Sequence, residues 1–92
     1  MRRITNLEWD DANREHIDRH GVAPQEVEEV CFSRPLLMKS RGGTRLAYGQ
    51  TLAGRYLLVV LRLMDGGVAR GITARTMTDK ERRFYGKRSR RP

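Results

Sequence analysis

The residues of this chain that could do chemistry are mostly arginines. Sixteen of its 92 residues are Arg and three are Lys, against eleven Asp and Glu, which gives a net charge of +8. Arg binds phosphate through two parallel hydrogen bonds, whereas Lys acts as a point charge. Eight of the acids lie in residues 8–29, and most of the bases come later. A small, lopsided and strongly basic domain indicates a polyanion or an acidic protein as its partner.

Most signatures of enzyme chemistry are missing. The sequence has no HExxH motif and no Cys or His pair at metal spacing, so we expect no metal. It has no Gly-rich nucleotide loop, so we expect no cofactor. Metal-independent phosphodiester cleavage remains, in which arginines stabilise the developing charge and a His, Tyr or Glu moves protons. RNA suits this chemistry because its own 2′-hydroxyl can be the nucleophile.

Three helices are expected to support these residues. Asp10 or Asp11 can cap a first helix that runs to about residue 20, where Gly21 ends it. Pro24 suits the first turn of a second helix, which ends before the next proline. The capping box at 78–81 opens a third helix that runs to about residue 85, and Gly86 can terminate it.

The apolar spacing between the second and third helices is that of strands. Four are expected, namely Leu36–Ser40, Arg45–Thr51, Tyr56–Met64 and Val68–Arg75. Short Gly-containing turns join them into an antiparallel meander, with Tyr56–Met64 central because both of its faces are apolar. The predicted fold class is therefore α+β: two N-terminal helices, a four-stranded antiparallel meander and a C-terminal helix. We expect a single domain over 1–92, with an ordered core at about 7–86 and a frayed basic tail at 87–92.

The compartment can be predicted from what the chain lacks. The apolar run Tyr56–Leu63 is far too short to span a bilayer, and the basic N-terminus leads into no apolar run. Cys31 is the single cysteine, so the chain forms no internal disulfide, and its apolar neighbours predict a core position. We therefore expect a cytoplasmic protein without a membrane partner.

Strand periodicity suggests a place for a site. The strand of Arg45 has small residues on the same face, at 47, 49 and 51, and the strand of Arg75 has them at 69, 71 and 73. If these faces lie on one side of the sheet, they floor a shallow groove edged by Arg45, Arg62 and Arg75, which could hold a phosphodiester backbone. The alternative is that the small residues only make room for the last helix.

Motifs along the chain follow the order and spacing of one family. They are Glu8-Trp9-Asp10, Asn13, Arg19-His20-Gly21-Val22, Glu26–Phe32, Pro35-Leu36, Gly49, Gly54-Arg55, Arg70–Arg75, Thr78, Glu81, Arg82, Arg83 and Tyr85. From about Leu7 to Tyr85 the chain resembles the BrnT toxins of type II toxin–antitoxin systems. The resemblance implies a RelE-like fold and an endoribonuclease that inhibits translation and growth. It also implies two partners, an RNA substrate and a DNA-binding, BrnA-like antitoxin, and no small-molecule cofactor.

The resemblance and the residue types together predict the site. We expect the catalytic residues to be Arg75, His20, Tyr85, Glu81 and Arg45, and the substrate-binding residues to be Arg62, Arg70, Arg82 and Arg83. Structural alternatives exist for several of them. Arg75 could pair with Glu81, Glu81 could cap the last helix, Tyr85 could pack in the core, and His20 could stabilise a helix end.

One departure from the family affects the predicted activity. Many members carry an acidic, His-containing stretch between the first two strands of the meander, whereas residues 38–44 of this chain are short and basic. The alternative function is therefore a catalytically inactive, toxin-like binding module that acts through its antitoxin or through nucleic acid.

Overall fold

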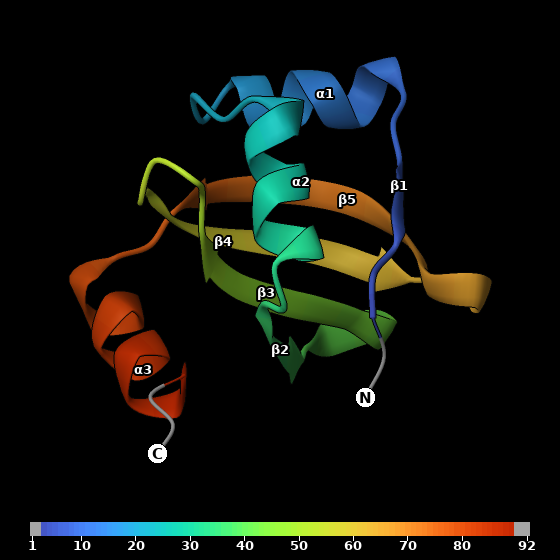
Figure 1. Cartoon of the computed structure of the whole chain (residues 1–92). Helices are drawn as coiled ribbons and strands as arrows, with labels where there is room; N and C mark the ends of the chain where they lie inside the picture. Colours follow the sequence, from blue (N-terminus) through green and yellow to red (C-terminus); the bar gives the residue numbers. More distant parts are fainter. Residues whose placement is uncertain (1–2, 90–92) are drawn as a thin grey trace.

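The computed structural model describes residues 3–89. The elements in order are β1 (Asn6–Glu8), α1 (Asp11–Asp18), α2 (Pro24–Phe32), β2 (Leu36–Lys39), β3 (Thr44–Gln50), β4 (Tyr56–Leu63), β5 (Val68–Thr76) and α3 (Asp79–Ser89). Single 3-10 turns at Arg41–Gly43 and Asp65–Gly67 join β2 to β3 and β4 to β5. The strands form one sheet in the order β1-β5-β4-β3-β2 (Figure 1).

The α+β class is confirmed, and β4 lies at the centre of the sheet as predicted. The predicted four-stranded antiparallel meander, β2 to β5, is only part of the sheet. A further strand, β1, precedes both N-terminal helices and pairs in parallel with β5, with Leu7 opposite Ala69. Three residues are too few for an alternating pattern to be read from the sequence. Within residues 3–89 the sheet therefore has five strands and is mixed.

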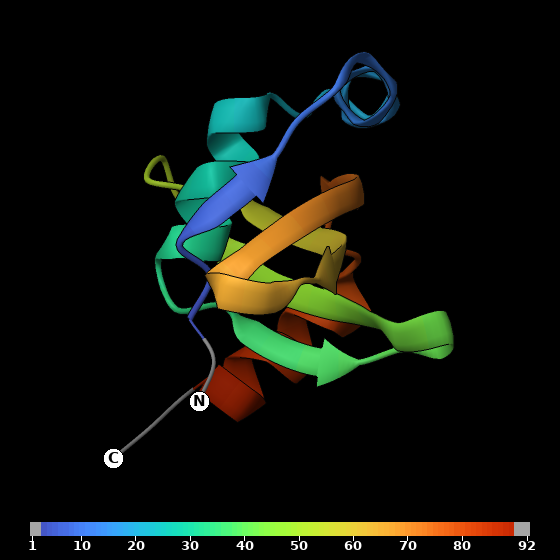
Figure 2. The ribbon, with the colours of Figure 1, turned by 90° about the vertical axis from the view of Figure 1, so that its right-hand side faces the viewer.

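The helices cover the two faces of the sheet unequally. Figures 1 and 2 show α1 and α2 on one face and α3 on the other, towards the β2 edge. The larger core lies under α1 and α2 and consists of Ile4, Leu7, Ile17, Val22, Val27, Val30, Cys31, Ala47, Leu57, Val59, Leu61, Ala69 and Ala74. A smaller core of Tyr48, Leu58 and Met77 lies on the α3 face. The face of the sheet that carries α3 is therefore less fully covered than the face under α1 and α2.

The helix ends follow the predicted signals with one exception. Asp10 caps α1 by accepting a hydrogen bond from the Asn13 N–H at 2.9 Å, and Gly21 has the left-handed φ of 68°. Gly86 does not end α3, which continues to Ser89, because this glycine keeps a negative φ and stays helical. Residues 87–89 of the predicted tail are therefore helical, and 90–92 lie outside the described residues. No helix within the described part of the chain is long and apolar enough to cross a membrane.

A β-bulge in β5 changes which side chains face each layer. Val60 pairs with Thr73 and Leu61 pairs with Gly71, so that Ile72 is the extra residue of the bulged strand. The extra residue reverses the alternation along β5. Thr73 consequently faces α3, whereas Gly71 faces α1 and α2.

Candidate nucleic-acid interface

The predicted groove of small residues does not form. Arg45 lies on the same face of β3 as Ala47 and is paired with Leu61 of β4. Ala47 and Leu61 are fully buried in the core under α1 and α2, so Arg45 faces that side. Arg62 and Arg75 instead share the opposite face with Leu58, which belongs to the core on the α3 side. The prediction that Arg45, Arg62 and Arg75 edge one groove is therefore wrong. Of the small residues, Gly49 makes room for α2, because a Cβ there would lie 2.9 Å from a methyl of Val30, whereas Gly71 has open space and Thr73 faces α3.

Arg75 lies near the end of β5 and faces α3. Its guanidinium donates two hydrogen bonds to the carboxylate of Glu81, at 2.7 and 2.8 Å. The same carboxylate accepts the N–H of Thr78 at 2.9 Å, and the Glu81 N–H donates to the Thr78 hydroxyl at 3.1 Å. Glu81 therefore both caps α3 and fixes the position of Arg75.

The protonation state of Glu81 follows from these bonds. The hydrogen bond from Arg75 is the main cause that holds the pKa of Glu81 below its ordinary value of 4.5, and the Thr78 N–H lowers it further against the effect of burial. Glu81 is accordingly an ionised carboxylate near neutral pH. Such a group suits the positioning of an arginine better than the donation of a proton.

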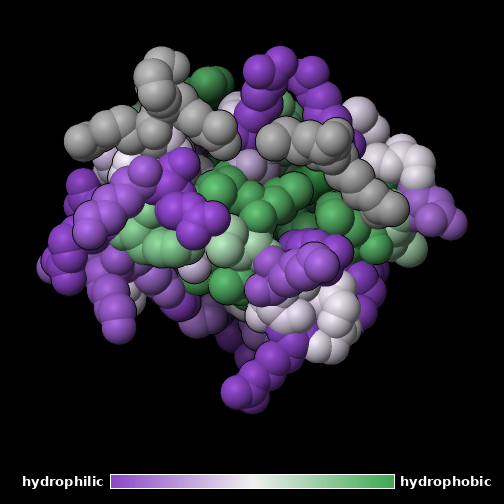
Figure 3. Space-filling model, turned by 90° about the horizontal axis from the view of Figure 1, so that it is seen from below, coloured by the Kyte–Doolittle hydropathy of each residue, from purple (hydrophilic) through white to green (hydrophobic). Residues whose placement is uncertain are grey.

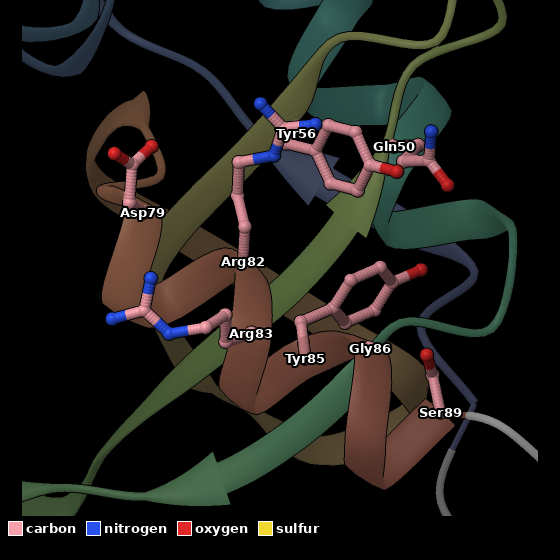
Figure 4. A pocket seen from close by; sticks show the side chains of 8 residues that line it. All are labelled: Gln50, Tyr56, Asp79, Arg82, Arg83, Tyr85, Gly86 and Ser89. Atoms are coloured by element: carbon pink, nitrogen blue, oxygen red, sulfur yellow. The ribbon is translucent and has the colours of Figure 1, made fainter.

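A cavity of about 460 Å³ lies between α3 and the end of the β3–β4 hairpin (Figure 4). We call it the α3 cavity, and it is lined by Gln50, Tyr56, Asp79, Arg82, Arg83, Tyr85, Gly86 and Ser89. The Arg82 guanidinium lies over the Tyr56 ring, 4.1 Å from its centroid. The Tyr85 ring meets Tyr56 edge-on, with 6.1 Å between centroids. A surface that combines cations with aromatic rings is suited to binding a single-stranded nucleic acid, because the cations bind its phosphates and the rings stack on its bases.

Only some of the predicted site residues come together. Tyr85, Arg82 and Arg83 line the α3 cavity, whereas Arg75 and Glu81 pair outside its lining. His20 is exposed in the turn between α1 and α2, which cover the opposite face of the sheet. His20 and Arg45 are thus on the α1 and α2 side, away from the other predicted residues.

Arg62 and Arg70 occupy the far end of the α3 face. They are direct partners across β4 and β5. Arg62 donates a 2.8 Å hydrogen bond to the Gly42 carbonyl, and Arg70 forms an ion pair with Asp10. Leu58, the partner of Arg75 in β4, lies four residues before Arg62, which is about 13 Å along the strand at ~3.3 Å per residue. The open part of the α3 face therefore has arginines at both ends.

Two residues of the α3 cavity, Gln50 and Tyr56, were not predicted. They are opposite one another at the end of the β3–β4 hairpin. The apolar pattern of β4 predicts a central strand for Tyr56, but this residue lies at the end of the strand, where the sheet can be open to solvent. The available signal was the hairpin pairing itself, which places a polar and an aromatic side chain together on the α3 face. Within residues 3–89, no three His, Cys, Asp or Glu side chains are placed to hold a metal ion.

The arrangement of these elements identifies the fold as that of the BrnT-like toxins. The crystal structure of the Brucella abortus ribonuclease toxin BrnT matches with a TM-score of 0.66, over 80% of this chain and 97% of that chain, at 16% sequence identity. The resemblance noted in the sequence is thus confirmed for the fold. No protein-family model and no curated protein sequence matches the chain.

Proposed function

We propose that this protein is a toxin that acts as an endoribonuclease, with its RNA bound across the α3 face. The α3 cavity carries the proposal, because it combines the guanidinium groups of Arg82 and Arg83 with the rings of Tyr56 and Tyr85. The shared fold with a ribonuclease toxin supports it. The arginines would bind phosphates, and the stacked Tyr56 and Arg82 would offer a flat surface to a base.

The proposed reaction is a transesterification that begins with the RNA's own 2′-hydroxyl. Its oxygen bonds to the adjacent phosphorus and gives its proton to a water molecule, while the bond from phosphorus to the 5′-oxygen breaks and that oxygen takes up a proton. Arg75, held by Glu81, stabilises the negative charge that develops on the phosphoryl oxygens. Tyr85 is the candidate proton donor to the leaving oxygen, and Arg62 and Arg70 extend phosphate binding along the sheet. The products carry a 2′,3′-cyclic phosphate, or the 3′-phosphate that water forms from it, and a free 5′-hydroxyl.

The mechanism predicts a defined response to metal removal and to substrate chemistry. Purified protein should cut RNA equally well with and without EDTA, because arginine rather than a metal ion stabilises the charge. An RNA with a single 2′-deoxy nucleotide at the cleavage position should bind but resist cutting, because the nucleophile is missing. Cleavage that EDTA abolishes, or equal cutting of the deoxy substrate, would contradict the mechanism.

The resemblance also supports a cellular setting. We propose that the toxin acts in the cytoplasm, where a DNA-binding antitoxin similar to BrnA neutralises it and represses their operon. Expression of the toxin alone should stop growth, and co-expression of its antitoxin should restore it. Arg82→Ala, which removes the cation over Tyr56, serves as the matched variant with reduced toxicity. Normal growth at verified expression of the folded wild-type protein would argue against the toxin.

One observation favours a second candidate, a toxin-like module that binds without cutting. Both ends of the Arg75 guanidinium are bound to Glu81, and Arg70 is paired with Asp10, so two predicted cations are already neutralised. Such a module would act through its antitoxin or through nucleic acid. It would bind the normal RNA and its 2′-deoxy analogue equally and would leave both intact.

A further inference from the structure

A second cavity lies at the β2 edge of the sheet. Its volume is about 750 Å³, and it is lined by Arg3, Ile4, Cys31, Arg34, Pro35, Leu36, Leu37, Tyr85, Arg88 and Ser89. We call it the edge groove. Figure 3, which views the molecule from the side of β2 and α3, shows a hollowed apolar surface framed by hydrophilic residues.

The edge groove is apolar because both hydrophobic cores reach the surface there. Ile4, Cys31 and Leu37 belong to or pack against the core under α1 and α2. Leu36 and Tyr85 pack against the core on the α3 face. The groove therefore runs across the end of the sheet, between the C-terminal parts of α2 and α3.

The strand that lines this groove is an edge strand. β2 pairs with β3 on one side, and no other strand in residues 3–89 pairs with its second side. Such an edge can add a strand from another chain through main-chain hydrogen bonds. Side chains of an added strand alternate between the two faces, so they would meet Leu37 on one face and Leu36 on the other.

The charged residues of the groove all have one sign. Arg3, Arg34 and Arg88 are exposed at its rim, and no acidic residue among residues 3–89 lines it. None of the three forms an ion pair within the described part of the chain. The rim therefore presents guanidinium groups without a carboxylate partner beside an apolar floor, although that of Arg88 also lies over the Phe84 ring, 5.6 Å from its centroid.

Arg34 occupies its place at an energetic cost. Its φ is +58°, and it is the one described residue other than glycine with a positive φ. It follows the end of α2, where a left-handed residue is usually Gly or Asn. The strained backbone holds an arginine at the mouth of the groove although a glycine would fit that backbone better.

We propose that the edge groove binds an acidic, apolar segment of a partner protein, which adds to β2 as a further strand. Charge complementarity selects this occupant. The chain's own last residues, 90–92, contain two bases and no acid, so their charge opposes binding at a rim of arginines. A second copy would bring the same arginines and a net charge of +8 against the rim.

The test uses two labelled peptides that do not depend on any ribonuclease activity. One has five Val-Glu repeats and presents an apolar and an acidic face as a strand, and the other has five Ser-Glu repeats with the same charge. Fluorescence anisotropy should show that the Val-Glu peptide binds at least about tenfold more tightly. Nuclear magnetic resonance should place its largest shifts at the amides of residues 36–39. Equal affinity for both peptides, or shifts centred elsewhere, would overturn the proposal.

Matched variants separate the groove from the overall charge. Arg34→Glu should weaken binding of the Val-Glu peptide, whereas Arg14→Glu, the same change at an exposed site on α1, should not. Arg34→Gly should weaken binding and also raise the melting temperature, because it relieves the positive φ, so lost binding cannot then be blamed on misfolding. Equal losses for Arg34→Glu and Arg14→Glu would overturn the proposal.

Two further results would assign the groove to another occupant. Sedimentation that shows a wild-type dimer, dissociated by Arg34→Glu, would identify a second copy. A marked gain in peptide affinity after removal of residues 90–92 would identify the chain's own end. A wild-type protein that stays monomeric and whose affinity is unchanged by the truncation is the result we expect.

Discussion

The pair of Arg75 and Glu81 allows the fold and the proposed chemistry to be tested separately. We predict that a double-mutant cycle will give the pair a coupling free energy of about 1 kcal/mol. The cycle consists of the wild type, Arg75→Ala, Glu81→Gln and the double variant. Gln keeps an oxygen that can accept the Thr78 N–H, so Glu81→Gln removes the charge but not the helix cap.

The magnitude follows from geometry and exposure. Unit charges about 4 Å apart attract by about 1 kcal/mol in water and by about 4 kcal/mol near a protein surface, before any cost of desolvation. The Arg75 side chain is 42% exposed and that of Glu81 is 22% exposed, so solvent screens the pair substantially. Exposed pairs are worth ~0.2–1 kcal/mol, and two parallel hydrogen bonds favour the upper end of that range.

Thermal unfolding followed by circular dichroism measures this coupling. A loss of about 1 kcal/mol lowers the melting temperature of a domain of this size by roughly 4–8 °C. Arg75→Ala should therefore remain folded at 25 °C. A coupling indistinguishable from zero would refute the structural account of the pair, and an unfolded Arg75→Ala would show that Arg75 is mainly structural.

The activity of the same variants tests the proposed role of Arg75. Arg75→Ala should cut RNA about 100-fold more slowly, as expected for the loss of a group that stabilises the transition state. Arg75→Lys should recover part of the rate, because Lys keeps the charge without the forked geometry. Glu81→Gln should lose less than Arg75→Ala, because the arginine remains. Equal rates for wild type and Arg75→Ala would remove Arg75 from the mechanism.

Three other predictions concern the fold. Gly49→Ala should cost about 1–3 kcal/mol in urea unfolding, because its Cβ would lie 2.9 Å from a valine methyl of α2, whereas Gly71→Ala, with open space, should not share this loss. Burial raises the pKa of the Cys31 thiol to about 12, so a thiol reagent at pH 8 should label only unfolded protein; rapid native labelling would contradict this burial. The pKa of Glu26 is lowered first by the backbone N–H of Ala23 and then by Arg55. The stability that the ionised Glu26 gives to the fold is therefore fully present above pH 4.5 and is lost as the pH falls through the lowered pKa. The difference in unfolding free energy between wild type and Glu26→Gln should shrink as the pH falls below 4.5. A difference that stays constant would show that Glu26 is not stabilised in its ionised form.

The parts of the fold that the sequence predicted are those set by local signals. Asp10, Gly21, Pro24 and the capping box at Thr78 each act on the backbone within a few residues, so the beginnings of the helices and the end of α1 could be placed from the sequence. β1 could not, because three residues become a strand only through the neighbouring β5. The bulge at Ile72 was equally invisible, since it depends on how two strands fit together rather than on either strand alone.

The same limit explains the mixed outcome for the site. The contact between Arg75 and Glu81 joins residues six apart, so it could be predicted as a structural alternative from the sequence. The position of Arg45 depended on which face of the sheet the helices cover, and periodicity alone does not determine that choice. The approach of Arg82 to Tyr56 required the packing of α3 against the sheet, which no local signal describes.

Tyr85 lines both the α3 cavity and the edge groove, and Ser89 does so too. A ligand in either site that fixes the position of the Tyr85 side chain therefore changes the lining of the other site. Linkage then makes the effect reciprocal: if a peptide in the edge groove changes the affinity for RNA by some factor, RNA changes the affinity for the peptide by the same factor. A partner that never touches the RNA could thus compete with it through one shared side chain, and the strength of that competition would be set by how differently the two ligands hold Tyr85.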